Sequence, residues 1–172
     1  SSRQTSARSG TTRRRKQKAH MDKDGTFAVK HNQIHYGYKL HQKTDVDNGL
    51  IREFDTTTAS THDNNVDLTE YGDDAVYRDK GYAGVAPHPG VKDMTMKKAA
   101  RGRPLTKQEK KYNKAIAKMR APGERPFAVL RRVFHGGHTR VKNLQRVTVQ
   151  EAMDCFAYNL YQLFTLKKQR KW

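Results

Sequence analysis

The chain has 172 residues, of which 34% are hydrophobic and 30% are charged, and its formal net charge at pH 7 is +18. This length suits one domain with one modest apolar core. The single cysteine excludes a disulfide framework and a cysteine-rich zinc site. No apolar run is long enough to span a membrane, so we expect no membrane contact.

The charge is unevenly distributed along the chain. Residues 1–20 carry seven Lys or Arg and no acid, residues 21–96 carry eight basic and thirteen acidic residues, and residues 97–172 carry twenty basic and four acidic ones. An acidic middle segment therefore separates two basic segments. A surface of this kind favours a polyanionic partner, and nucleic acid is the first expectation. A basic protein without such a partner is the alternative.

The first half of the chain predicts a basic tail followed by a hairpin. Residues 1–20 are mostly Ser, Thr, Arg and Lys with almost nothing to bury, so we expect them to be disordered. From Ile34 apolar and polar residues alternate over seven positions, which predicts a half-buried strand. Asn48-Gly49 predicts a tight hairpin turn with positive φ at both positions, and residues 50–58 predict the returning strand.

After the hairpin, Asp63 is expected to cap a short helix that ends near Tyr71. The segment AVYRD, residues 75–79, predicts a buried strand that ends on the carboxylate of Asp79, and residues 91–96 predict a weaker strand. A strand tip is a rigid place for a carboxylate that binds a metal ion. The simpler alternative is that Asp79 only opens the turn that follows it.

The second half of the chain is expected to be helical. Thr106 and Glu109 form a T-x-x-E capping box at the start of a helix over KQEKKYNKAIAKMR. Pro122-Gly123 should interrupt or kink this helix, which resumes near Pro126.

A last helix is predicted to begin at a second capping box, formed by Thr148 and Glu151, and to end near Leu166. Apolar residues at helical spacing predict the side of this helix that faces the core. They are Met153, Phe156, Leu160 and Leu163.

Three charged residues share one face of the first long helix. Arg120 and Glu124 are four residues apart, and Arg131 follows seven residues later. An ion pair accounts for Arg120 with Glu124. It does not explain why Glu124, the only acid between Glu109 and Glu151, is surrounded by so many cations in the sequence. A carboxylate that binds Mg²⁺ beside arginines that hold DNA phosphates accounts for both.

Four stretches together resemble the catalytic part of prokaryotic insertion-sequence transposases of the DDE type: HYGYKLHQKTDVDNGLI, TTASTHDNN, VYRDKGYAG and KMRAPGERPFAVLRRVF. The later segment AMDCFAYNLYQL resembles the closing helix of that family. Asp79 matches the family's second catalytic acid in its D-x-G-Y signature. Glu124 matches the third acid in a Y-x2-R-x3-E-x6-K pattern, in which Arg120 fits, Arg131 replaces the usual Lys and Ala117 replaces the usual Tyr.

The resemblance implies an α/β fold of the ribonuclease H-like type, with a mixed sheet flanked by helices. It implies three catalytic carboxylates, Asp79 and Glu124 among them, that hold two Mg²⁺ (or Mn²⁺) ions for phosphodiester hydrolysis and strand transfer at transposon ends. The implied partner is double-stranded DNA, both transposon ends and target, bound by a homodimer in the cytoplasm in association with the nucleoid. The DNA contacts are expected mainly within residues 97–146, and the residues singled out are Lys80, Arg120, Arg131, Arg132, Arg140 and Lys142.

The family's first catalytic aspartate sits on a central strand within an apolar run, and we find no such run in this chain. We therefore expect an N-terminally truncated catalytic domain over residues 21–166, with basic tails at 1–20 and 167–172, that is marginally stable and inactive in strand transfer. One alternative is that Asp22 or Asp24 replaces the first acid. Another is a non-catalytic, basic nucleic-acid-binding protein, in which Asp79 and Glu124 are ordinary surface residues.

Overall fold

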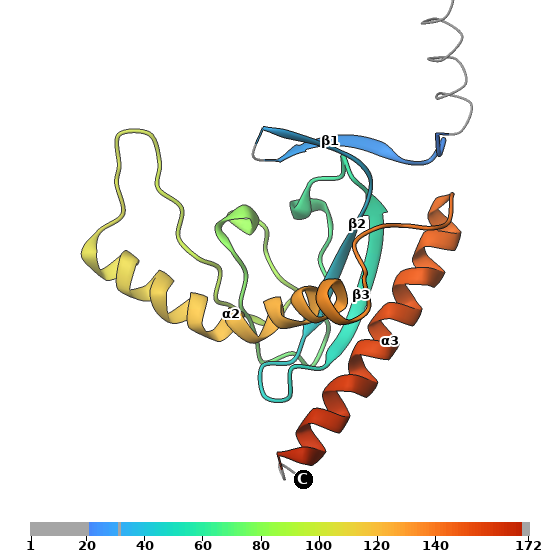
Figure 1. Ribbon diagram of the computed structural model, residues 1–172. Coiled ribbons are helices and arrows are strands. Elements are labelled where there is room, and N and C mark those ends of the chain that lie inside the picture. The colour runs from blue at the N-terminus through green and yellow to red at the C-terminus, as the bar shows by residue number, and fades with distance from the viewer. Residues whose placement is uncertain (1–20, 31, 170–172) are drawn as a thin grey trace, which may run out of the picture.

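The computed structural model of the chain describes residues 21–30 and 32–169, and the expected tail at 1–20 lies outside them (Figure 1). The strands are β1 (Thr26–Lys30), β2 (Gln33–Thr44), β3 (Ile51–Thr58), β4 (Ala75–Val76) and β5 (Lys92–Asp93). The helices are α2 (Lys107–Val133) and α3 (Leu144–Lys168), with 3-10 turns η1 (Asp63–Asn65) and η2 (Lys80–Tyr82). None of the described helices is long and apolar enough to cross a membrane.

The strands form two separate sheets. β1, β2 and β3 pair in that order as an antiparallel sheet, whereas β4 and β5 form a short parallel ladder. The α/β class is confirmed, but no single mixed sheet joins the described strands. β1 has no counterpart among the predicted strands; it pairs with residues 33–37 of β2, at an end of the sheet where Ile34 stays exposed.

The hairpin of β2 and β3 is confirmed, but its turn is longer than the predicted two-residue type. Residues 45–50 connect the strands, and the Asp45 carboxylate accepts hydrogen bonds from the N–H groups of Asn48 at 2.6 Å and Gly49 at 3.2 Å. Of this pair only Gly49 has a positive φ, 67°. The Asp45 side chain closes the loop, so a second residue of positive φ is not needed.

The segment predicted as a helix from Asp63 to about Tyr71 forms only η1. The backbone leaves the helical region at Val66, which is extended and buried. The side chain of Asp67 then binds the backbone N–H and the hydroxyl of Thr69. Asp and Thr side chains that bind nearby backbone in this way compete with helix formation.

Polar side chains attach α3 to the hairpin. Three of them bind the backbone of residues 48–51: Tyr158, Asn159 and Gln162. The Asn159 amide accepts from Ile51 N–H and donates to Ile51 O, each at 2.9 Å. These bonds join the last helix to the hairpin loop and the start of β3. Figure 1 shows α3 lying along β3.

The core lies where the hairpin meets both helices. Its buried cluster takes residues from β3, α2 and α3, and three partly buried side chains pack against it. The cluster is Ile51, Val129, Leu130, Cys155 and Tyr158, and the side chains packed on it are Leu40, Phe54 and Phe134.

The predicted core face of α3 is wrong for three of its four residues, and only Leu163 is half-buried. Met153 and Phe156 are 64% and 62% exposed, and Leu160 is also exposed. The inner face is mixed instead, because several of its positions bind the hairpin backbone through polar groups. The buried residues of α3 are Val147, Cys155, Tyr158, Gln162 and Leu166.

The predicted start of α3 is also wrong. The helix begins at Leu144, and the Thr148 hydroxyl donates to the Leu144 carbonyl inside the helix instead of capping it. Asp22 and Asp24 accept hydrogen bonds from the N–H groups of Asn143 at 2.8 Å and Leu144 at 3.2 Å. Because these partners lie far away in the sequence, no local pattern indicates them.

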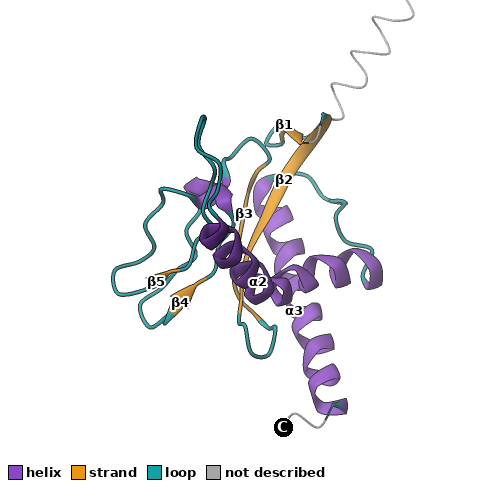
Figure 2. Cartoon of the chain, turned by 90° about the vertical axis from the view of Figure 1, so that its left-hand side faces the viewer, coloured by secondary structure: helices purple, strands orange, loops and turns teal. Residues whose placement is uncertain are grey.

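α2 begins at the predicted capping box, in which Thr106 and Glu109 each bind the other's backbone N–H. It continues as one helix through Pro122 and Pro126, so the predicted interruption is absent. The predicted kink is present instead: the first half of α2 lies across Figure 1 and the second half is seen nearly end-on, whereas Figure 2 shows the second half from the side. Gln42 on β2 donates to the Gly123 carbonyl at 3.1 Å, at the bend.

We predict that Asn159→Ala lowers the free energy of unfolding by about 1–3 kcal/mol, because the backbone N–H and C=O of Ile51 both lose their partner. Urea unfolding followed by circular dichroism measures the change. Asn65→Ala, at an exposed residue of η1, is the control and should change stability by less than about 0.5 kcal/mol. An Asn159→Ala variant as stable as the wild type would show that the Asn159 hydrogen bonds do not stabilise the attachment of α3 to the hairpin.

A second comparison tests which apolar residues form the core. Leu130→Ala should lower the free energy of unfolding by about 2–5 kcal/mol, since it leaves a cavity in the buried cluster. Phe156→Ala should change it by less than about 0.5 kcal/mol, because that side chain already faces solvent. Equal losses of unfolding free energy in the two variants would support the core face of α3 that the sequence predicted.

Candidate active site

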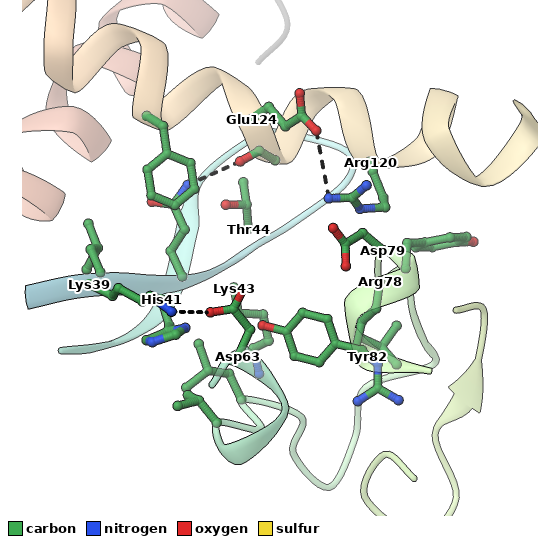
Figure 3. Close-up of a pocket in the computed structure, with 18 of the residues that line it drawn as sticks. Lys39, His41, Lys43, Thr44, Asp63, Arg78, Asp79, Tyr82, Arg120 and Glu124 are labelled. Carbon is green, nitrogen blue, oxygen red and sulfur yellow. Dashed lines mark hydrogen bonds and ion pairs between the residues drawn. The ribbon is translucent and has the colours of Figure 1, made fainter. Parts of the chain in front are cut away.

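An open cleft of about 1070 Å³ lies between β2, the segment of residues 59–82 and α2. Figure 3 shows ionisable side chains from all three walls around it. β2 contributes Lys39, His41 and Lys43; the middle segment contributes Asp63, Arg78, Asp79 and Tyr82; and α2 contributes Arg120, Glu124 and Arg131. Residues from separate parts of the chain thus meet at one place.

Asp79 lies in this cleft, but it is not at a strand tip. β4 ends at Val76, and Asp79 is the residue that caps η2, where its Oδ1 accepts from Gly81 N–H at 2.6 Å. The alternative that Asp79 opens a turn is therefore correct as local structure. The hydrogen bond also orients the carboxylate, and Oδ2 makes no hydrogen bond with the described residues. One carboxylate oxygen thus remains for a ligand.

Glu124 and its two arginines line the same cleft from α2, as their spacing predicted. The Glu124 carboxylate lies 3.7 Å from the Arg120 guanidinium, and its side chain is 71% exposed. An exposed pair four residues apart on a helix contributes only about 0.3–0.5 kcal/mol. Glu124 is therefore held weakly, and a stronger cation would displace Arg120 at little cost.

Arg78, beside Asp79, is a site residue that sequence reasoning missed. Its side chain is 6% exposed, lies 3.5 Å from Asp93 and 3.8 Å from Asp67, and donates to the Thr95 hydroxyl at 3.2 Å. A buried cation between two carboxylates ties the segments around Asp79 together. The signal in the sequence was a lone arginine directly after the apolar run AVY.

Tyr82 lies among charges of both signs. Burial raises the pKa of Tyr82, the carboxylates of Asp63 and Asp79 raise it further, and Arg78 and Arg120 oppose this rise. The phenol therefore stays protonated at neutral pH. The Arg78 guanidinium also lies 5.5 Å from the centre of its ring.

The β2 wall holds two further polar pairs. Lys39 lies 3.2 Å from the Asp63 carboxylate, so this acid is already paired. His41 is buried, with its Nε2 2.9 Å from the Thr57 hydroxyl, and burial lowers the pKa of this imidazole. At neutral pH His41 is therefore uncharged, and it forms part of the β2 wall without adding charge to the cleft.

Asp22 and Asp24 do not line the cleft. They bind the first N–H groups of α3, and a hydrogen bond from Tyr38 also reaches Asp22 at 2.8 Å. Loss of hydration raises the pKa of Asp22, but the hydrogen bonds from Asn143 and Tyr38 outweigh it and keep the net value low. The structure therefore does not bring either acid to Asp79 and Glu124.

Only two of the cations expected to contact DNA line the cleft. Arg120 and Arg131 line the cleft, whereas Arg132 is exposed on α2 outside it. Lys80 is exposed on η2. Arg140 and Lys142 lie in the loop between α2 and α3, where Lys142 is near enough to Asp22 to lower the pKa of that carboxyl.

Asp79 and Glu124 fit one kind of metal site. No group of three or more Asp, Glu, His or Cys within residues 21–30 and 32–169 is arranged to hold a metal ion. Mg²⁺, however, is commonly held by one or two carboxylates and completes its shell with water and substrate phosphates. The two acids suit such a shared site but not a three-carboxylate site.

Comparison with known proteins places these residues in context. The profile of the family described as "Transposase DDE domain" matches residues 8–160. A transposase for insertion sequence element IS1106 from Neisseria meningitidis serogroup B is 30% identical over 149 residues, which cover 81% of this chain and 51% of that protein. The chain thus spans about half the length of this curated relative. No solved structure matches the chain.

We predict that Arg78→Met lowers the free energy of unfolding at pH 7 by about 1.5–3 kcal/mol, because two carboxylates and a hydroxyl lose a buried cationic partner. Arg52→Met is the control, since Arg52 forms an exposed pair with Asp45 at 2.8 Å and should cost less than about 1 kcal/mol. Urea unfolding compares the two variants with the wild type.

The Arg78→Met effect should depend on pH. Burial raises the pKa of Asp93, but hydrogen bonds from Thr95 and the nearby Arg78 bring it below its ordinary value of 3.8. A lowered pKa in the folded state stabilises the protein above pH 3.8, and this contribution is lost as the pH falls through the folded-state value. The difference in free energy of unfolding between Arg78→Met and the wild type should shrink in that acidic range. An unchanged difference would contradict the assignment of Asp93 as a stabilising partner of Arg78.

Proposed function

The chain belongs to the family of transposase DDE domains, and from this premise we propose that its cleft is a metal-dependent site for hydrolysis and transfer of DNA phosphodiester bonds in transposition. One observation carries the proposal. Asp79 and Glu124 converge on the same cleft from elements 45 positions apart, together with Arg120 and Arg131. Two carboxylates beside two guanidinium groups suit a divalent cation and a phosphate.

The proposed metal ligands are Asp79 and Glu124, and the metal is Mg²⁺ or Mn²⁺. A pair of such ions, when bound, activates the attacking water or 3′-hydroxyl and stabilises the leaving oxygen. Gly81 N–H fixes the direction of the Asp79 carboxylate through Oδ1 and leaves Oδ2 for the cation. Glu124 would turn from Arg120 to the cation, which leaves that guanidinium to contact a DNA phosphate beside it.

The third acid of a complete DDE site is proposed to come from a strand that the described residues do not supply. The cleft separates β2 from β4, which belong to different sheets. In its β2 wall, Gln42 Oε1 and Thr44 Oγ1 are buried without a hydrogen-bond partner among the described residues. A strand between β2 and β4 would join the two sheets into the mixed sheet of a ribonuclease H-like fold and would satisfy such groups.

Metal binding tests the ligand assignment. Mn²⁺ binding to the 172-residue chain with duplex DNA, measured by electron paramagnetic resonance, should weaken by about tenfold or more in Asp79→Asn and in Glu124→Gln, because each change removes a charged ligand. Asp47→Asn, at an exposed residue of the hairpin loop outside the cleft, is the matched control and should bind Mn²⁺ like the wild type. Wild-type affinity in both cleft variants would refute the assignment.

A cleavage assay with transposon-end DNA separates the remaining alternatives. Since two carboxylates hold a metal pair poorly, we expect this chain alone to leave the DNA uncut. Mg²⁺-dependent cleavage that disappears in Asp22→Ala or Asp24→Ala would show that one of these acids completes the site. DNA binding that ignores divalent metal and both cleft variants would favour the non-catalytic nucleic-acid-binding protein. A homodimer on DNA remains a proposal, which sedimentation of the DNA complex tests.

A further inference from the structure

The first half of α2 carries lysines that the proposed function does not use. Lys107, Lys111, Lys114 and Lys118 are spaced four, three and four residues apart, so they lie on one face of the helix. We call this set the lysine stripe. All four side chains are exposed, and none lines the cleft. Figure 1 shows this half of α2 extending away from the sheet and α3.

The stripe is turned away from the rest of the protein. The buried residues of this half of α2 are Asn113 and Ile116, which helical spacing places on the opposite side. The two acids of the helix, Glu109 and Glu124, lie off the stripe and are already paired with arginines. No stripe lysine forms an ion pair with another residue of the described chain. The four charges are therefore balanced only by solvent ions.

Stability of the helix does not explain this arrangement. Lys107 with Lys111 and Lys114 with Lys118 are like-charge pairs four residues apart, which repel each other. Lys107 and Lys111 also lie in the first turns of α2, where the helix dipole disfavours cations. A polyanion laid along the stripe would relieve both repulsions.

We propose that the lysine stripe binds the phosphate backbone of a segment of duplex DNA that is separate from the strand in the cleft. The identity of the polyanion rests on the proposed function, whereas the place of contact rests on the stripe itself. With a rise of about 1.5 Å per residue, the four lysines span roughly 16 Å, which is enough to contact several phosphates. Because stripe and cleft lie on different sides of α2, one chain then holds two DNA segments, as the joining of one DNA to another requires.

The salt dependence of duplex binding, measured in EDTA, tests the contact. In a variant with Lys107, Lys111, Lys114 and Lys118 all changed to Gln, the slope of log K against log salt should fall by up to about 3.6, since each phosphate contact contributes roughly 0.9. The matched control changes four other exposed lysines to Gln and so removes the same charge: Lys23, Lys92, Lys167 and Lys168. A stripe variant whose slope falls no further than that of the control would overturn the proposal.

Thermal unfolding of the same variants excludes a merely structural role. The stripe variant should unfold at the same temperature as the wild type or at a higher one, because Gln is a good helix former and the repulsion is removed. A lower unfolding temperature together with weaker binding would attribute the binding loss to damage of α2 and would also overturn the proposal.

A bridging assay tests whether the two DNA segments are separate. The wild-type chain on a bead-bound duplex should capture a second, labelled duplex, and the stripe variant should lose about tenfold or more of this capture while it still binds the beads. Unchanged capture by the stripe variant would overturn the proposal. So would a stripe variant that loses binding to phosphatidylserine vesicles but binds duplex DNA like the wild type. All these readouts are independent of metal, so wild-type Mn²⁺ affinity in Asp79→Asn and Glu124→Gln would refute the proposed metal site and leave this inference standing.

Discussion

The attachment of α3 to the backbone of residues 48–51 is the interaction on which the rest of this structure depends. Tyr158, Asn159 and Gln162 bind that backbone, and Tyr158 is at the same time a buried member of the core. The attachment places β3, and β2 paired to it, against the cluster that α2 also enters. Gln42 then joins β2 to the bend of α2. Two of the three cleft walls therefore hold their positions because α3 binds the hairpin of β2 and β3.

The third wall is held by charge. Lys43 on β2 lies 3.1 Å from Glu70 and 3.2 Å from Asp73, and Arg78 lies between Asp67 and Asp93. Many acids of the middle segment are therefore used inside the protein, where they tie an irregular stretch to the sheet. Two short strands alone would not hold this stretch, because so small a ladder has few hydrogen bonds and little apolar surface.

The cations of the second half are used differently. Arg120 and Arg131 face the cleft, where Arg120 pairs weakly with Glu124, and the lysines of the outer face of α2 pair with no described acid. The charge imbalance seen in the sequence thus becomes a spatial one: many acids of the middle segment form ion pairs within that segment, and the basic helix remains open to a polyanion. Weak pairing in the cleft also matters for the proposed chemistry, because carboxylates that bind a metal must exchange their partners easily.

The sequence by itself determined the features that depend on neighbouring residues. Alternation predicted β2, the T-x-x-E box predicted the start of α2, and spacing predicted that Arg120, Glu124 and Arg131 share a face. Motifs also pointed to Asp79 and Glu124, which line one cleft, although their role as metal ligands stays a proposal. The turn of the hairpin and the cap of α3 are also local, since Asp45 bonds N–H groups of its own loop and Asn143 accepts from Arg146 N–H, but periodicity alone missed both. Only the tertiary structure decided the buried face of α3 and the contacts of Asp22 and Asp24 at its first turn. In both cases a side chain forms a hydrogen bond with a residue far away in the sequence: Asp22 with Asn143 across 121 positions, and Asn159 with Ile51 across 108. Such contacts exist only once the chain has folded, so hydrophobic pattern alone placed apolar Phe156 in the core and missed buried Gln162.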